Sequence, residues 1–216
     1  MTQDESKHQP HTAPTERRHT QFELLRQRRF LPFFLVQALG AFNDNVYRQA
    51  IIGLLFWLGV SPEQRTLYTN LAPALFILPY FLFSATAGQI AEKYEKAALI
   101  RVTTAMEIAI MSLAAVGFLT QNMTVLLVAL FATGVQSTLF GPVKYSLLPS
   151  VLKPEELTGG NGLVEMGTFV AILLGTIAGG ILVAMAPGGP VWAGAVAVAV
   201  AVIGWFASRG IPHTPP

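Results

Sequence analysis

Residues 40–48 read GAFNDNVYR, and they lie inside a stretch, residues 30–60, whose other side chains are mostly apolar. The stretch contains one acid, Asp44, and one base, Arg48, four residues apart. A charged side chain at the centre of a bilayer costs at least about 2.5–3.5 kcal/mol on insertion scales, so it is seldom kept there without a function. The sequence therefore predicts a membrane helix that carries a polar functional site.

The composition supports a membrane protein throughout. Of the 216 residues, 52% are hydrophobic and only 12% are charged, and the mean hydropathy is +0.51. Charged residues make up about 25% of an average soluble domain. Four stretches contain no Asp, Glu, Lys or Arg, and each is close to the roughly 20 residues that a helix needs to cross the hydrocarbon. They are residues 67–91, 123–143, 166–186 and 190–208.

The polar connections divide the chain into an all-α membrane protein with six transmembrane helices. The predicted spans are residues 30–59, 67–91, 97–119, 123–146, 161–186 and 190–208. Residues 1–29 are predicted to be a flexible cytosolic tail, residues 30–208 the six-span bundle, and residues 209–216 the start of a cytosolic linker. The tail has no apolar core of a signal peptide.

The basic residues predict the orientation of the bundle. Of the fourteen Lys and Arg residues, twelve precede the first span or follow spans two, four and six, and only Arg65 falls on the opposite side. Loops rich in Lys and Arg stay in the cytoplasm. Both termini are therefore predicted to be cytoplasmic, which agrees with an even number of spans.

A helical face in the first span and a polar group in the fourth are the predicted substrate-binding residues. Residues three, four or seven apart share a face of a helix. The alternative is that Asp44 and Arg48 only neutralise each other, but the asparagines beside them add donors and acceptors that also need partners. The predicted set is Asn43, Asp44, Asn45, Arg48 and Gln136.

Further charged residues lie within or at the ends of the spans and form a predicted gating or charge network: Glu92, Lys93, Glu107, Lys144 and Glu165. Lys144 can snorkel to the interface, or pair with Glu165 or with a phosphate headgroup. Glu107 has no obvious partner in the sequence, so it either caps a polar network or carries a proton.

Glycines in the fifth span predict close helix packing. Small residues on one face let helix backbones approach in a membrane, where that contact supplies much of the association energy. The predicted packing residues are Gly167, Gly175, Gly179 and Gly180.

Several kinds of chemistry are not expected. The chain has no cysteine, so disulfides and thiolate metal sites are excluded. All four His lie outside the spans, and no phosphate-binding Gly-rich loop is present. The net charge of +2 does not indicate a nucleic-acid partner. No metal and no cofactor are predicted.

Several motifs resemble those of known transporters. The loop at residues 88–96, GQIAEKYEK, is similar to the signature that follows the second helix in the major facilitator superfamily. Residues 40–48, 140–149 (FGPVKYSLLP) and 161–169 (NGLVEMGTF) resemble motifs of its lysophospholipid transporter family. The resemblance implies the N-terminal six-helix half of a twelve-span carrier that moves lysophospholipids across the bacterial inner membrane.

The resemblance also implies partners and roles. Membrane lipids, a lysophospholipid substrate, and a C-terminal six-helix half or a second copy are expected as partners. The chain is then a fragment, a truncated fusion or a dimerising half. Arg48 is expected to hold the substrate phosphate and Asp44 its ammonium group, while Lys144 and Glu165 gate the cytoplasmic side. Two alternatives remain: a membrane anchor for an acyltransferase fused to an acyl-carrier-protein synthetase, and a general solute carrier.

Overall fold

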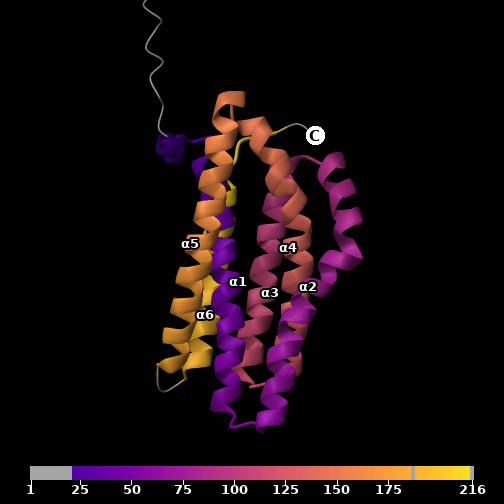
Figure 1. The fold of residues 1–216 in the computed structure, drawn as a ribbon, viewed down its shortest axis with the longest axis vertical. Helices are drawn as coiled ribbons and strands as arrows, with labels where there is room; N and C mark the ends of the chain where they lie inside the picture. The colour runs from indigo at the N-terminus through magenta and orange to yellow at the C-terminus, as the bar shows by residue number, and fades with distance from the viewer. Residues whose placement is uncertain (1–20, 186–187, 215–216) are drawn as a thin grey trace, which may run out of the picture.

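The structure is a computed structural model that describes residues 21–185 and 188–214. Most of the predicted tail, residues 1–20, lies outside the described residues. The described residues fold into long helices that run up and down the length of the molecule (Figure 1). The helices are α1 (Leu31–Trp57), α2 (Pro62–Lys93), α3 (Lys96–Leu119), α4 (Met123–Val151), α5 (Leu157–Ala184) and α6 (Gly189–Ser208), with short 3-10 helices η1 (Gln21–Arg26) and η2 (Pro154–Glu156).

Local sequence signals set several of the helix ends. Ser61 and Gln64 form a capping box at the start of α2, where Pro62 occupies the first helical turn. Glu95 and Asn122 accept hydrogen bonds from the first turns of α3 and α4. Each cap satisfies backbone N–H groups that have no partner within the helix.

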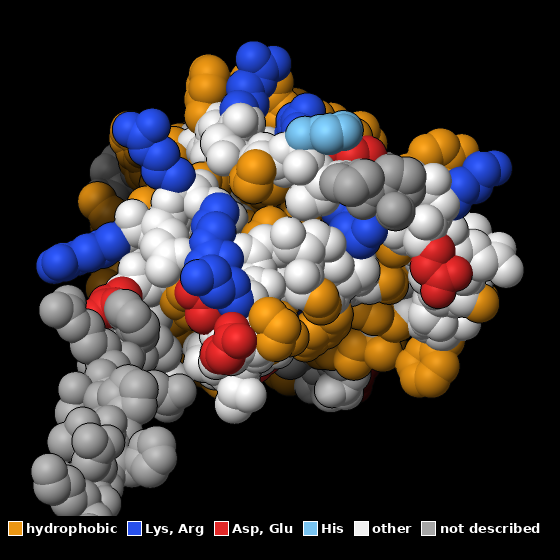
Figure 2. Space-filling view, turned by 90° about the horizontal axis from the view of Figure 1, so that it is seen from above, with side chains coloured by type: hydrophobic (Ala, Val, Ile, Leu, Met, Phe, Trp, Pro, Cys, Tyr) orange, Lys and Arg blue, Asp and Glu red, His pale blue; other side chains and the backbone are white. Residues whose placement is uncertain are grey.

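Helix α1 occupies the interior of the bundle. It packs against α5 and α6, while α4 packs against α2 and α3, and α3 also contacts α6 (Figure 1). The N-terminus of α1 and the C-terminus of α6 lie at the same end of the molecule. Seen from that end, Lys and Arg side chains are spread over the surface (Figure 2). We call it the charged end.

The prediction of an all-α membrane fold is confirmed. Five described helices, α2 to α6, are long and apolar enough to cross a membrane. Helix α1 has sufficient length, with 27 residues. It is not among the helices that are both long and apolar enough, so the count of six spans stays a prediction.

Two apolar clusters lie at different heights in the bundle. One includes Tyr47, Met111 and Leu130. The other lies nearer the charged end and includes Phe33, Ile100 and Leu147. On α1, α3 and α4 the segments between these clusters carry buried polar side chains: Gln37 and Asn43, Thr103 to Glu107, and Thr133 to Thr138. The fold therefore places a polar layer at mid-length, between two apolar layers.

Candidate functional site

A cavity of about 320 Å³ opens within this polar layer. Its wall combines acidic, basic and amide side chains with aromatic and small apolar ones, and all the long helices except α6 contribute to it. The lining residues are Val36, Gln37, Gly40, Ala41, Asp44, Tyr80, Thr104, Glu107, Gln136, Ser137, Phe140, Gly141, Lys144, Tyr145 and Thr168. A polar pocket of this kind inside an apolar bundle is suited to an amphipathic molecule.

Asp44 lies on the cavity wall and has no ion-pair partner among residues 21–185 and 188–214. The Ser137 hydroxyl donates to Asp44 Oδ2 at 3.3 Å. Arg48 does not line the cavity. Its Nη2 donates to Asn45 Oδ1 at 2.8 Å, and its guanidinium lies over the Phe76 ring, 5.1 Å from the centroid. The described structure therefore lacks the internal Asp44–Arg48 pair that would neutralise both charges.

Glu107 is the second carboxyl group on the cavity wall, and it comes from α3. Asn43 Nδ2 donates to Glu107 Oε1 at 2.8 Å. Asn43 itself is fully buried, and Glu107 is only 6% exposed. This contact joins α1 to α3. Gly40 lies beside it, and a side chain added there would approach Glu107 Oε2 to 3.9 Å.

Gln136 also lines the cavity, so four of the predicted residues line one cavity: Asp44, Glu107, Lys144 and Gln136. Gln136 Nε2 donates to the Thr103 carbonyl at 3.3 Å. The Ser137 hydroxyl, which faces Asp44, is also 3.4 Å from Gln136 Oε1. The amide of Gln136 is thus fixed by α3.

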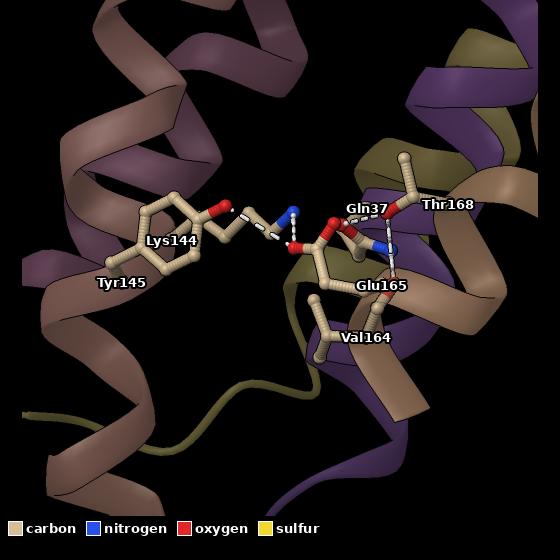
Figure 3. Close-up of polar contacts among 6 residues, drawn as sticks. All are labelled: Gln37, Lys144, Tyr145, Val164, Glu165 and Thr168. Atoms are coloured by element: carbon tan, nitrogen blue, oxygen red, sulfur yellow. Dashed lines mark hydrogen bonds and ion pairs between the residues drawn. The ribbon is translucent and has the colours of Figure 1, made fainter. Parts of the chain in front are cut away.

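The predicted partnership of Lys144 and Glu165 is present toward the charged end of the cavity (Figure 3). Lys144 Nζ and the Tyr145 hydroxyl both donate to Glu165 Oε1, at 3.0 and 3.2 Å. The Lys144 side chain is 11% exposed and that of Glu165 is 44% exposed. The pair bridges α4 and α5.

A neutral contact lies beside this ion pair. Gln37 Nε2 donates to the Val164 carbonyl and to Thr168 Oγ1, both at 2.8 Å, and joins α1 to α5 (Figure 3). Helix α5 is therefore held on one side by a charge pair with α4 and on the other by an amide contact with α1.

The structure places the remaining predicted residues elsewhere. Glu92 and Lys93 are exposed at the end of α2 and do not line the cavity. Lys93 Nζ lies 5.6 Å from the centroid of the adjacent Tyr94 ring. Neither residue has an ion-pair partner in the part of the chain that the structure describes.

Sequence reasoning missed several cavity residues, and three hydroxyl-bearing examples are Tyr80, Thr104 and Thr168. Each lies in a mostly apolar helix, and the two threonines give little signal because Ser and Thr hydroxyls in helices usually bond their own backbone. Thr104 could have been found, because it lies three residues before Glu107 in α3 and residues at that spacing share a helical face.

Three of the four predicted packing glycines face α1. A side chain at Gly167 would strike Phe34, one at Gly175 the carbonyl oxygen of Phe42, and one at Gly179 the backbone of Val46. Gly180 has no atom within 4 Å of the added Cβ position.

No group of three metal-ligating side chains occurs within residues 21–185 and 188–214. The described cavity instead offers two carboxyl groups, a lysine, amides and hydroxyls, which can bind a cargo by charge and hydrogen bonds.

Comparisons with known proteins show which transporters this chain is similar to. The family model described as Major Facilitator Superfamily matches residues 33–216. The lysophospholipid transporter LplT of Serratia proteamaculans is 28% identical over 162 residues, which cover 73% of this chain and 37% of that protein. The protein of the same name from Escherichia fergusonii is 29% identical over 184 residues, covering 81% of this chain and 43% of that protein. The one from Salmonella heidelberg is 31% identical over 157 residues, covering 70% and 36%. The chain thus spans about two fifths of the length of these relatives.

Proposed function

Because this chain belongs to the Major Facilitator Superfamily, we propose that it forms one half of a carrier that moves lysophospholipids across the bacterial inner membrane by alternating access. In such carriers the substrate site lies near the midplane, between two helix bundles that rock against each other. The position of the polar cavity between two apolar layers supports this assignment.

The main support for the proposal is the position of the Asp44 carboxyl group in the cavity. It faces the cavity, and within the described residues a serine hydroxyl at 3.3 Å is its hydrogen-bond partner. A positively charged group in the cavity would supply the missing counter-charge. The ammonium group of an ethanolamine headgroup has the required charge and can donate to the carboxylate.

The phosphate of such a headgroup needs a cation on the same wall. Sequence reasoning assigned this role to Arg48, whereas the structure favours Lys144, because Lys144 lines the cavity and Arg48 does not. Binding of the phosphate by Lys144 would compete with Glu165, which lies 3.0 Å from its Nζ. Arrival of the cargo would then weaken the contact between α4 and α5, and so link binding to opening of the charged end.

The charged end is proposed to face the cytoplasm. Its Lys and Arg side chains (Figure 2) match the bias that holds basic loops inside. Both described ends of the bundle, Leu31 of α1 and Ser208 of α6, then lie on the cytoplasmic side.

The superfamily match and the named transporter relatives favour a carrier over an enzyme for this chain. The anchor of an acyltransferase is the weaker alternative. A mere anchor has no need of an Asp44 carboxyl group inside a lined cavity, where each buried charge reduces stability.

Uptake of labelled lysophosphatidylethanolamine by spheroplasts that produce the full reading frame carrying this chain tests the proposal. We expect Asp44→Asn to weaken uptake at low substrate concentration by roughly 10- to 100-fold, which corresponds to loss of one charge-assisted hydrogen bond of about 1.5–3 kcal/mol. Glu63→Gln, an exposed acid at the start of α2, is the matched control and should retain uptake. Undiminished uptake by Asp44→Asn would remove Asp44 from the site.

A further inference from the structure

The contact between Asn43 and Glu107 contains an unsatisfied atom. Asn43 has no exposed surface, and its Nδ2 donates to Glu107 Oε1 at 2.8 Å. Its other amide atom, Oδ1, is buried and has no hydrogen-bond partner among the described residues. A buried amide oxygen needs a donor, and an ionised carboxylate beside it can only accept.

The charges around Glu107 do not supply a counter-ion. Within residues 21–185 and 188–214 no Lys, Arg or His nitrogen lies within ion-pair distance of it, while Lys144 is paired with Glu165 and Arg48 is bonded to Asn45. Helix α6 contributes no titratable side chain. The titratable or charged groups on the elements around Glu107 include Asp44, Tyr47 and Arg48 (α1), Tyr80 (α2), Arg101 (α3), Lys144 and Tyr145 (α4) and Glu165 (α5).

Protonation of Glu107 would satisfy both the Asn43 amide and the Glu107 carboxyl group. If Glu107 carries a proton, its O–H can donate to Asn43 Oδ1 while Asn43 Nδ2 donates to the other carboxyl oxygen. An acid and an amide that face each other in this way close a ring of two hydrogen bonds. The same proton removes a buried negative charge that has no cation partner, which is how isolated buried acids are usually accommodated.

We propose that Glu107 is a proton-binding site of this protein, held as a neutral carboxylic acid by its pairing with the Asn43 amide. The proton reaches it through the cavity, because Glu107 lines the wall and Gly40 beside it has no side chain to block the approach. The O–H bond forms on Glu107 with a proton from solvent, and no other bond changes.

The proposal has a consequence for the cavity that also rests on the proposed function. With Glu107 neutral and bonded to Asn43, Asp44 is the cavity-lining carboxyl group left to pair with one positive group of a cargo. Binding of the proton itself does not depend on the identity of the cargo, and the experiment below measures only the proton.

Infrared spectroscopy of the purified chain in lipid nanodiscs at neutral pH tests the site. Carboxyl groups in contact with water are ionised at that pH, so the carbonyl stretch of a protonated acid reports a buried one. We expect this band in the unaltered chain, its loss in Glu107→Gln and its retention in Asp44→Asn. Absence of the band from the unaltered chain, or an undiminished band in Glu107→Gln, would overturn the proposal.

A labelling experiment keeps the test decisive if a variant does not fold. Aspartate labelled with ¹³C shifts any carbonyl band that comes from Asp44 and leaves a band from Glu107 in place. We therefore expect the band of the unaltered chain to stay unshifted under aspartate labelling and to shift under glutamate labelling. The reverse pattern would assign the proton to Asp44 and contradict the proposal.

Discussion

Asp44 and Glu107 line the same cavity, but the residues that contact them differ. Asp44 meets a single hydroxyl, that of Ser137, at 3.3 Å. Glu107 meets a fully buried amide, that of Asn43, at 2.8 Å. The first arrangement leaves an acceptor free for a cargo, whereas the second joins two helices. At the scale of single residues, the two carboxyl groups therefore have separable roles in binding and in stability.

Stability measurements separate these roles. Glu107→Gln should unfold at nearly the same temperature as the unaltered chain, because a glutamine amide can both accept from and donate to Asn43. Glu107→Ala leaves the Asn43 side chain without a partner and should reduce the free energy of unfolding by about 1–3 kcal/mol, as is usual for an unsatisfied buried polar group. Thermal unfolding in detergent, followed by circular dichroism, gives both values. Equal loss in the two variants would mean that the charge of Glu107 stabilises the fold.

Lys144 provides a second residue-scale prediction. Lys144→Gln removes the proposed phosphate partner and should lower lysophosphatidylethanolamine uptake at low substrate concentration by roughly 10-fold or more, the effect of losing a charge-assisted hydrogen bond. The matched variant is Lys153→Gln, an exposed lysine between α4 and η2. Uptake that falls equally in both variants would contradict a specific role for Lys144.

Helix α5 fits against α1 because glycines remove side chains from the interface. Gly175 and Gly179 place the α5 backbone directly on Phe42, Val46 and Gln49 of α1. Gly134 of α4 permits a similar approach to the Phe76 carbonyl of α2. Since lipid tails are as apolar as the helices, this close contact is a main source of cohesion between the elements.

Adjacent glycines allow a matched test at this scale. Gly179→Ala puts a methyl group 2.9 Å from the Val46 carbonyl oxygen and should destabilise the bundle by about 1–3 kcal/mol through overpacking. Gly180→Ala meets open space and should leave stability unchanged, or raise it by up to about 1 kcal/mol through better helix propensity. Unfolding midpoints of the two variants in one detergent decide the matter; equal midpoints would mean that α5 does not pack in this register.

An ion pair joins the segment before α1 to the connection between α4 and α5. Arg29 Nη2 donates to both carboxylate oxygens of Glu156, at 2.7 and 2.6 Å, and Nη1 donates to the Val151 carbonyl at 2.6 Å. Burial of Glu156 opposes ionisation, yet the Lys153 amide and the Arg29 guanidinium outweigh it and hold the pKa of Glu156 below its usual 4.5.

This lowered pKa predicts acid sensitivity of the α4–α5 connection. A carboxyl group with a lowered folded-state pKa stabilises the fold above its unfolded pKa, and this contribution disappears as pH falls through the folded value. After correction for the pH dependence of intrinsic amide exchange, we expect lower protection factors around Val151 and Leu157 below about pH 4 than at neutral pH, by a modest factor since the pair is partly exposed. Glu156→Gln should remove this pH dependence, and the neighbouring exposed Glu155→Gln should not.

The molecule as a whole has one charged end and one end with few charges, which gives it a direction in the membrane. The helices alternate so that the C-terminus of α2, the N-terminus of α3 and both described ends of the bundle share the charged end (Figure 1). At the opposite end, Arg65 lies over the Phe56 ring, 4.2 Å from its centroid. The proposed orientation follows from this distribution as a whole.

Cysteine labelling measures the orientation directly, because the chain has no native cysteine. Glu63→Cys lies at the end with few charges and Glu155→Cys at the charged end, and both positions are exposed. In intact spheroplasts an impermeant maleimide should modify Glu63→Cys at once and Glu155→Cys only after permeabilisation, as the positive-inside rule requires. The reverse pattern would show that the charged end faces outward.

The sequence alone predicted the membrane class, the approximate helix bounds and the polar positions within the helices. It could do so because a bilayer limits the length of a spanning helix and the charge that it can carry. Long runs without charge predict the spans, and an acid such as Asp44 inside an apolar stretch predicts a polar site. The tertiary structure decided which of these residues meet. Asn43 and Glu107 are 64 residues apart, and only helix packing brings them together.

The tertiary structure also separated neighbours that look alike in sequence. Gly179 contacts α1 and Gly180 does not, because each successive helical residue turns by about 100° around the axis. Arg48 likewise turns toward Phe76 while Asp44 faces the cavity. A sequence specifies the periodicity of such positions, but the direction that each face takes depends on which helices surround it.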